Sequence, residues 1–344
     1  MSALPPGVTR AVLLAAVVTL LCGCNQEPPA DGHGSERAAA QEDNIPPSAV
    51  VELREGPSAE ELAAPTRIVM LGTGTPIPDA RRAGSSIALV HRGETYLFDV
   101  GAGAVHNATR ARYRYDIPSL YPSQVCCVFI THLHSDHTMD YSELAYTLWW
   151  RRSARLQAFG PAGMVEMTEG MHAMMAPDRR LRTSGIQPVQ NPEAHLVDVR
   201  EIADGFVFEK DDLRIEAFEV DHGDIRPAYG YRIQAGDRVA VISGDTAISD
   251  RLLDMSRGAD FLFHEVISDS GLARNSAGFQ AYHRASHTPA SDLGRLASEA
   301  KPGMLVLYHG LFYGAPEATV VDEVHKTYDG PVVLANDLDV FEFD

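Results

Sequence analysis

Cysteine is scarce in this sequence: the 344 residues contain 4 cysteines, and two of these, Cys22 and Cys24, lie close to the N-terminus. A small domain held together by disulfides needs a larger and more regularly spaced set, so the sequence contains no disulfide framework. The other two, Cys126 and Cys127, are neighbours in the apolar run VCCVFI. Because neighbouring residues of a strand point to opposite faces, we expect two buried thiols, with a disulfide between them as the alternative.

Basic residues are also few compared with acidic ones. The chain has 29 lysines and arginines against 47 aspartates and glutamates, which gives a formal net charge of -18. A total charge of this sign opposes the binding of a polyanion such as RNA. The length and the 45% of hydrophobic residues allow a full core in one large domain or two small ones, and no internal repeat is evident.

The apolar run that follows Arg10 covers about a dozen residues, which is too short for a helix that spans a bilayer and typical of a signal peptide. It ends in Leu21-Cys22-Gly23-Cys24, which resembles a bacterial lipobox. That resemblance implies that residues 1–24 are a lipoprotein signal peptide and that Cys24 carries acyl chains. The protein would then be exported and anchored to a bacterial membrane surface, facing the periplasm or the exterior. An ordinary secretory signal and an uncleaved anchor are the alternatives.

Residues 25–66 are rich in Pro, Ala, Glu, Gly and Ser without a sustained apolar period, which predicts a disordered tether. The folded domain is expected over residues 67–344. Short apolar runs there predict strands: RIVML, SIALVH, TYLFDV, VCCVFI, RLQAF, LRIEAFEV, YGYRI, RVAVIS, DFLFHEV, MLVLY and PVVLA. Helical patterns follow several of them, notably over 141–152, 289–300 and 316–328. Tandem and helix-separated strands together indicate a mixed α/β domain of layered sheets and covering helices.

The stretch FITHLHSDHTMD places four metal-binding side chains within six positions directly after an apolar run: His132, His134, Asp136 and His137. Where a strand leaves the sheet, such side chains can converge on a cleft, and residues two apart on extended backbone project to the same side. Imidazole and carboxylate ligands without thiolate suit Zn and are acceptable to Fe or Mn. A catalytic tetrahedral ion keeps one of its four positions open, so four such side chains in one short stretch suggest two ions. A solvated polar loop is the alternative.

Three isolated residues also follow strand-like runs: His222 in EVDHGD, Asp245 in VISGDT and His309 in LVLYHG. All could lie along the same rim of the sheets as His132. Taken singly, each is a weak signal.

The ordered set LGTGTP, LFDVGAG, THLHSDH, FGPAG, VDHGD, SGDT, FHE, HT and LYHG resembles the metallo-β-lactamase superfamily, and within it the ribonuclease Z and arylsulfatase-like branch. The match runs from Arg67 to Asp344. It implies a single-domain α/β fold, an αββα sandwich, with a dinuclear site at one edge of two sheets. It also implies which residues bind: His132, His134 and His222 would hold one cation, Asp136, His137 and His309 the other, and Asp245 would bridge them.

The resemblance further implies a metal-held hydroxide as the nucleophile, with two divalent cations, zinc or alternatively manganese or iron. His287 in SHTPAS matches the position that protonates the leaving group, and Glu265 in FHE matches a carboxylate that orients this histidine. Asp136 is assigned to the reaction as well as to the metal. Asp99 in LFDVG is expected to support the ligands from behind. The glycines of LGTGTP lack both the GxGxxG spacing and the P-loop ending, so we expect a tight turn there.

The branch implies a phosphodiesterase acting on a small molecule or another phosphodiester, with homodimerisation by family habit. The lipobox-like N-terminus places this activity outside the cytoplasm. Cleavage of precursor tRNA is doubtful, because an exported protein would not meet this substrate and the net charge is -18. Arylsulfatase-like, lactone or ester hydrolysis by the same site is the alternative, since specificity resides in loops. A membrane-tethered protein that binds metal without turnover is the alternative from another class.

Overall fold

The computed structural model describes residues 57–343. The predicted signal peptide, the lipidation site Cys24 and most of the predicted tether lie outside the described residues. The first element is α1 (Ala59–Ala63), whose N-terminus is closed by a capping box between Ser58 and Glu61. This helix falls inside the segment 25–66 that we expected to be a tether, so ordered structure begins before Arg67.

No helix among residues 57–343 combines the length and the apolar content needed to cross a bilayer.

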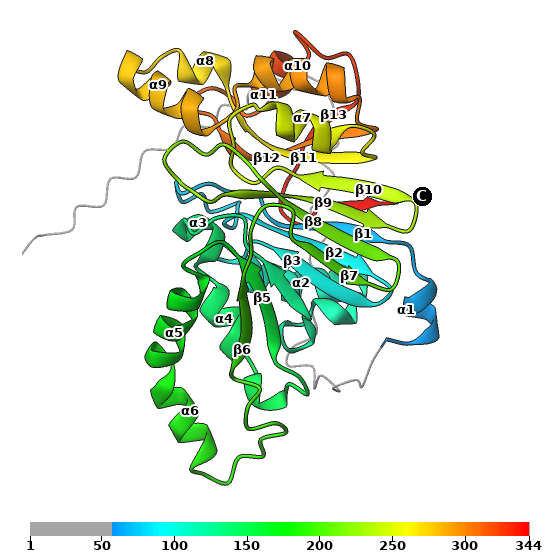
Figure 1. Ribbon diagram of the computed structural model, residues 1–344, viewed down its shortest axis with the longest axis vertical. Helices are drawn as coiled ribbons and strands as arrows, with labels where there is room; N and C mark the ends of the chain where they lie inside the picture. Colours follow the sequence, from blue (N-terminus) through cyan, green and yellow to red (C-terminus); the bar gives the residue numbers. More distant parts are fainter. Residues whose placement is uncertain (1–56, 344) are drawn as a thin grey trace, which may run out of the picture. The chain divides into compact units, whose positions relative to one another are not determined.

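Two seven-stranded sheets form the centre of the described part of the chain (Figure 1). In the first sheet the order is β14 (Val340–Glu342), β1 (Arg67–Gly72), β2 (Ser86–His91), β3 (Glu94–Phe98), β4 (Cys127–Phe129), β5 (Leu156–Gly160) and β6 (Val197–Glu201). In the second it is β13 (Val332–Leu334), β12 (Met304–Leu311), β11 (Phe261–Ile267), β10 (Arg238–Ile242), β9 (Tyr229–Ala235), β8 (Leu213–Glu219) and β7 (Val207–Lys210). Strands β3 to β6 are parallel to one another, and so are β10 to β13.

Alternating side chains of the strands pack on two different layers. On β1, Ile68 and Met70 pack in the core between the two sheets, whereas Val69 and Leu71 pack against the helices outside the first sheet. On β12, Leu305 and Leu307 likewise face the helices outside the second sheet. A strand buried on both faces reads as a continuous apolar run, which explains why runs such as RIVML were recognisable.

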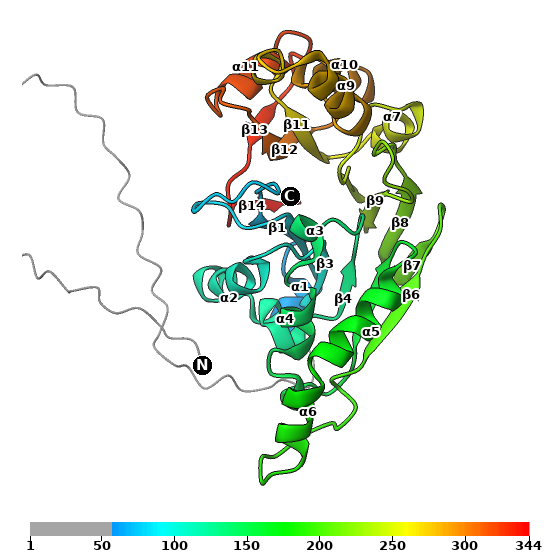
Figure 2. The ribbon, with the colours of Figure 1, turned by 90° about the vertical axis from the view of Figure 1, so that its left-hand side faces the viewer.

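Helices cover the outer face of each sheet, so the predicted αββα sandwich is confirmed (Figure 2). The first sheet is accompanied by α2 (Ala104–Tyr115), α3 (Ser135–Thr138), α4 (Tyr141–Tyr146), α5 (Met164–Met174) and α6 (Ala176–Thr183). The second is accompanied by α7 (Asp250–Ser256), α8 (Asp269–Leu272), α9 (Ala277–Ser286), α10 (Ala290–Ala300) and α11 (Thr319–Val324). Residues 57–343 also contain three short 3-10 helices: η1 (Pro118–Leu120), η2 (Pro122–Gln124) and η3 (Trp149–Arg151).

The helix predicted over residues 141–152 is wrong as one element. The structure ends α4 at Tyr146 and places Leu148 at a φ of 54°, in the left-handed region that breaks a helix. Arg152 then turns into the core, where it is 2% exposed and donates hydrogen bonds to the carbonyls of Pro122, Val125 and Leu144. This arginine ties the chain after α4 to the loop before β4.

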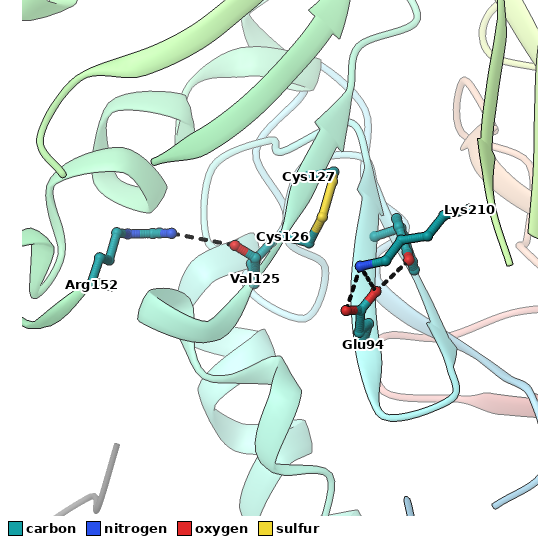
Figure 3. Close-up of a disulfide and its surroundings, with 7 residues drawn as sticks. Glu94, Val125, Cys126, Cys127, Arg152 and Lys210 are labelled. Atoms are coloured by element: carbon teal, nitrogen blue, oxygen red, sulfur yellow. Dashed lines mark hydrogen bonds and ion pairs between the residues drawn. A yellow bond between two sulfur atoms is a disulfide. The ribbon is translucent and has the colours of Figure 1, made fainter. Parts of the chain in front are cut away.

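Cys126 and Cys127 form a disulfide, so the expectation of two free thiols is wrong (Figure 3). Strand β4 begins at Cys127, so Cys126 precedes the strand and the alternation of a strand does not separate the two side chains. The ion pair between Lys210 Nζ and Glu94 Oε1, 2.6 Å apart, lies in the same view.

Candidate metal centre

The loops that follow β4, β8 and β10 converge with β12 at one edge of the two sheets. Hydrogen bonds join the sheets there: the hydroxyl of Tyr231 donates to the carbonyl of Ile130, and the amide of Tyr229 donates to the carbonyl of Thr131. Gly244 has a φ of 62°, and a Cβ at this position would lie 2.7 Å from the carbonyl oxygen of Tyr229 and 3.1 Å from Cβ of Thr131, which follows β4 of the first sheet. Only glycine therefore lets the loop after β10 approach the other sheet closely enough to deliver Asp245.

His132, His134 and His222 form the first cluster. His134 Nδ1 lies 3.0 Å from His132 Nε2 and 3.4 Å from His222 Nε2. The opposite ring nitrogens of two members are held from behind: His222 Nδ1 donates to the carbonyl of Ser286 at 2.7 Å, and His132 Nδ1 lies 3.0 Å from Thr131 Oγ1. These bonds direct both Nε2 atoms toward the cluster.

Asp136, His137 and His309 form the second cluster. Asp136 Oδ2 lies 3.1 Å from His309 Nε2 and 3.4 Å from His137 Nε2. His137 Nδ1 donates to Asp99 Oδ2 at 2.7 Å, which turns Nε2 of the same ring toward Asp136. Asp99 also accepts hydrogen bonds from the amide and hydroxyl of Thr131, so it braces both clusters from behind.

Asp245 lies between the two clusters. Its Oδ1 is 3.5 Å from His137 Nε2, and its Oδ2 is 3.5 Å from His309 Nε2 and 4.0 Å from His132 Nε2. One carboxylate thus faces members of both clusters. The structure therefore brings together all seven side chains that we expected to meet.

The donor set and its spacing fit divalent cations. Nitrogens bound to one tetrahedral zinc at about 2.0–2.1 Å lie about 3.3 Å apart, close to the 3.0 and 3.4 Å observed around His134. His137 Nε2 and Asp245 Oδ1 are fully buried yet have no hydrogen-bond partner among the described residues. Buried polar atoms are rarely left unpaired, so these atoms have the environment of ligands. Both clusters could each hold one cation.

Burial and mutual charge set the protonation of the clusters. Burial lowers the pKa of His132 well below its usual value and lowers that of His222 to about 4, so both rings are neutral at pH 7 with free lone pairs. The pKa of His137 moves the other way: burial alone would lower it, but the carboxylates of Asp245 and Asp99 raise it. A cation at the second cluster must therefore displace a proton.

His287 and Glu265 form a buried ion pair beside the clusters. His287 Nδ1 lies 3.2 Å from Glu265 Oε1 and 3.9 Å from Asp245 Oδ2. Glu265 is fixed by the amide of Thr288, which donates to Oε1 at 2.9 Å. Burial opposes a charged imidazole, but Glu265 raises the pKa of His287 to about 9. At neutral pH His287 is thus protonated and can act as a proton donor.

Two further buried histidines lie outside both clusters. His264 is fully buried and hydrogen-bonds through Nδ1 to the carbonyl of Glu265, outside both clusters. His283 lies close to the dyad, with its ring 5.8 Å from that of His287. It hydrogen-bonds to Tyr313, a residue that the sequence gave no reason to select. Of the tryptophans, Trp149 is in the core and Trp150 packs under the guanidinium of Arg182.

Comparisons with known proteins agree with this architecture. A family model described as "Beta-lactamase superfamily domain" matches residues 94–310. Ribonuclease Z of Mycolicibacterium gilvum is 33% identical over 204 residues, which are 58% of this chain and 68% of that protein. The metallo-beta-lactamase fold protein YhfI from Bacillus subtilis superposes with a TM-score of 0.62 at 19% identity, covering 81% of this chain and 100% of that chain. Human tRNase Z, short form, gives 0.59 at 20% identity, covering 81% and 99%. At these identities, both structures show a shared fold.

Proposed function

The chain belongs to the metallo-β-lactamase superfamily, and from this premise we propose that it is a metal-dependent phosphodiesterase that uses two divalent cations. A metal-dependent hydrolase of ester bonds is the class that the family, the ribonuclease Z relatives and the clustered histidines together support. The observation that carries the proposal is the position of Asp245, whose two oxygens lie 3.5 Å from histidines of the second cluster and 4.0 Å from His132 of the first.

Seven side chains would hold the two cations: His132, His134 and His222 the first, Asp136, His137 and His309 the second, and Asp245 both. Zinc suits these ligands, with manganese or iron as alternatives. When bound, such a pair neutralises charge on the phosphate oxygens and lowers the pKa of water enough to make it a nucleophile near neutral pH.

The residues of the chain supply the proton that the leaving alkoxide needs. His287 Nδ1 faces Glu265, so Nε2 is left to carry the transferable proton. Glu265 keeps the ring charged and in one orientation, because it is itself held by the amide of Thr288. Asp99 holds His137 from behind, which keeps the ring of this ligand in a fixed direction.

The experiment is to load the purified protein with zinc or manganese and assay an aryl phosphodiester. His309→Ala and Asp245→Ala should each lose at least hundredfold in kcat/KM, because each removes a side chain that faces the cations. His106→Ala is the matched control, since this exposed histidine of α2 lies outside both clusters. Absence of turnover in the native protein, or equal activity in Asp245→Ala, would refute the proposal.

The same assay run on aryl sulfates, lactones and β-lactams compares the ester and sulfate alternatives by kcat/KM. Stoichiometric metal with no hydrolysis in the whole panel would instead support a binding protein. We propose a small phosphodiester as the substrate, because the net charge of -18 opposes a polyanion. A precursor tRNA belongs in the panel, and faster cleavage of it would contradict this choice.

We also propose that the protein acts outside the cytoplasm, anchored through Cys24, on the strength of the lipobox-like LCGC alone. Metabolic labelling with a radioactive fatty acid should label the native chain and not Cys24→Ser. Equal labelling of both would contradict the anchor. The expected homodimer is tested by light scattering on the purified protein.

A further inference from the structure

Tyr313 and His283 form a partly buried hydrogen-bonded pair that the chemistry described above does not use. The hydroxyl of Tyr313 lies 2.6 Å from His283 Nε2. His283 belongs to α9 and is 7% exposed, whereas Tyr313 follows β12, four residues after His309. The pair therefore connects the helix that ends at the proton donor His287 with the strand that delivers a predicted metal ligand.

The direction of this hydrogen bond follows from the other nitrogen of the ring. His283 Nδ1 lies 2.9 Å from the carbonyl oxygen of Phe279, and a carbonyl can only accept, so Nδ1 carries the proton. Burial lowers the pKa of His283, which keeps the ring neutral at pH 7 and Nε2 unprotonated. The hydroxyl of Tyr313 must then donate to Nε2. Its oxygen is left with lone pairs only, so it can accept a hydrogen bond from another molecule and cannot donate one.

Tyr313 lines a cavity of about 250 Å³ whose wall also includes Thr73, Gly74 and Gly310. This cavity adjoins the second cluster, because Gly310 follows His309 directly and the amide of His309 donates to the carbonyl of Thr73 at 3.1 Å. Tyr313 has a φ of 45°, a conformation that is unfavourable for a bulky side chain. Strained residues of this kind persist only where the surrounding structure holds them in place, and they cluster at functional sites.

We propose that Tyr313 is a specificity-determining residue that accepts a hydrogen bond from a hydroxyl group of the substrate beside the scissile phosphate. His283 is a positioning residue, because it holds the phenol in the accepting orientation. The class of substrate selected is a phosphodiester that carries a hydroxyl on the group next to the phosphate, as a ribose does, over one that lacks it. This inference rests on the proposed phosphodiesterase function and narrows its substrate.

The test compares two compounds that differ only in hydroxyl groups, the 4-nitrophenyl esters of uridine 5′-phosphate and of 2′,3′-dideoxyuridine 5′-phosphate. The native protein should prefer the uridine ester by about tenfold in kcat/KM, the worth of one or two hydrogen bonds. Tyr313→Phe should lose this preference by slowing only the uridine ester. Tyr282→Phe is the matched control: this neighbouring tyrosine is exposed, does not line the cavity, and keeps its ring contact with His283.

Equilibrium binding of the two free nucleotides provides a second readout that needs no turnover. We expect the uridine nucleotide to bind more tightly than the dideoxy nucleotide to the native protein and equally to Tyr313→Phe. Equal binding of the two by the native protein, or an equal loss for both in Tyr313→Phe, overturns the role of Tyr313. Hydrolysis of no phosphodiester by the metal-loaded protein overturns the proposed function instead, so the two failures are distinguishable.

Discussion

Replacing Glu265 by glutamine should move the pH dependence of catalysis without changing the shape of the site. Glutamine keeps an oxygen that can accept from the amide of Thr288, but it removes the negative charge 3.2 Å from His287 Nδ1. That charge is the main reason why the pKa of His287 is raised from 6.5 to about 9. This rise in the pKa corresponds to about 3 kcal/mol of preference for the protonated ring.

The sign of the effect follows from which form donates the proton. The protonated His287 is the active form, so activity persists below its pKa and falls as the pH rises through it. In the native protein this basic limb should lie near pH 9, and in Glu265→Gln it should move toward 6.5. At pH 8 the protonated fraction then drops about thirtyfold, whereas at pH 6 it hardly changes.

The assay is kcat for an aryl phosphodiester with a poor leaving group, measured from pH 5.5 to about 10 at saturating metal. Bound cations shift the pH of the basic limb in both proteins, so the test is the difference in this pH between the native protein and the variant. Glu323→Gln is the matched control, because this buried glutamate accepts hydrogen bonds from amides at the start of α8 and belongs to neither cluster nor the dyad. An unmoved basic limb in Glu265→Gln, or equal losses at pH 6 and pH 8, would refute the reasoning.

Three further predictions concern binding and stability. Asp99→Asn should weaken metal binding about 10–100-fold in a chelator competition, because the carboxylate that accepts from His137 loses its charge. The circular dichroism spectrum should stay unchanged, and an unchanged metal affinity would contradict this role. Binding of metal should release at least one proton per protein near pH 7, as His137 loses the proton that its carboxylate neighbours favour, and calorimetry in buffers of different ionisation enthalpy measures it. Zero release would show that this ring is neutral beforehand. Arg152→Ala should lower the free energy of unfolding by about 3 kcal/mol or more, because three buried carbonyls lose their hydrogen-bond donor. A loss below about 1 kcal/mol in a denaturant titration would argue against the network.

Strands were predictable where burial on both faces produced continuous apolar runs, as in β1, β2 and β11. The sequence did not predict the strands that are short, exposed or rich in charged residues. β6 (Val197–Glu201) and β7 (Val207–Lys210) are edge-side strands with acidic and basic residues, and β14 has only three residues. Such strands are held by pairing with a neighbour that is distant in sequence, which no local pattern encodes.

The sequence alone determined the local part of the site. His132, His134, Asp136 and His137 lie within six residues, so a strand end and one helical turn suffice to bring them near one another. Tertiary structure decided the rest. Asp136 and His309 are 173 residues apart, and only the packing of the two sheets places their atoms 3.1 Å from each other. The pairing of His283 with Tyr313 likewise appears only in the folded chain, because hydrogen bonding depends on distances in space that residue spacing along the chain does not fix.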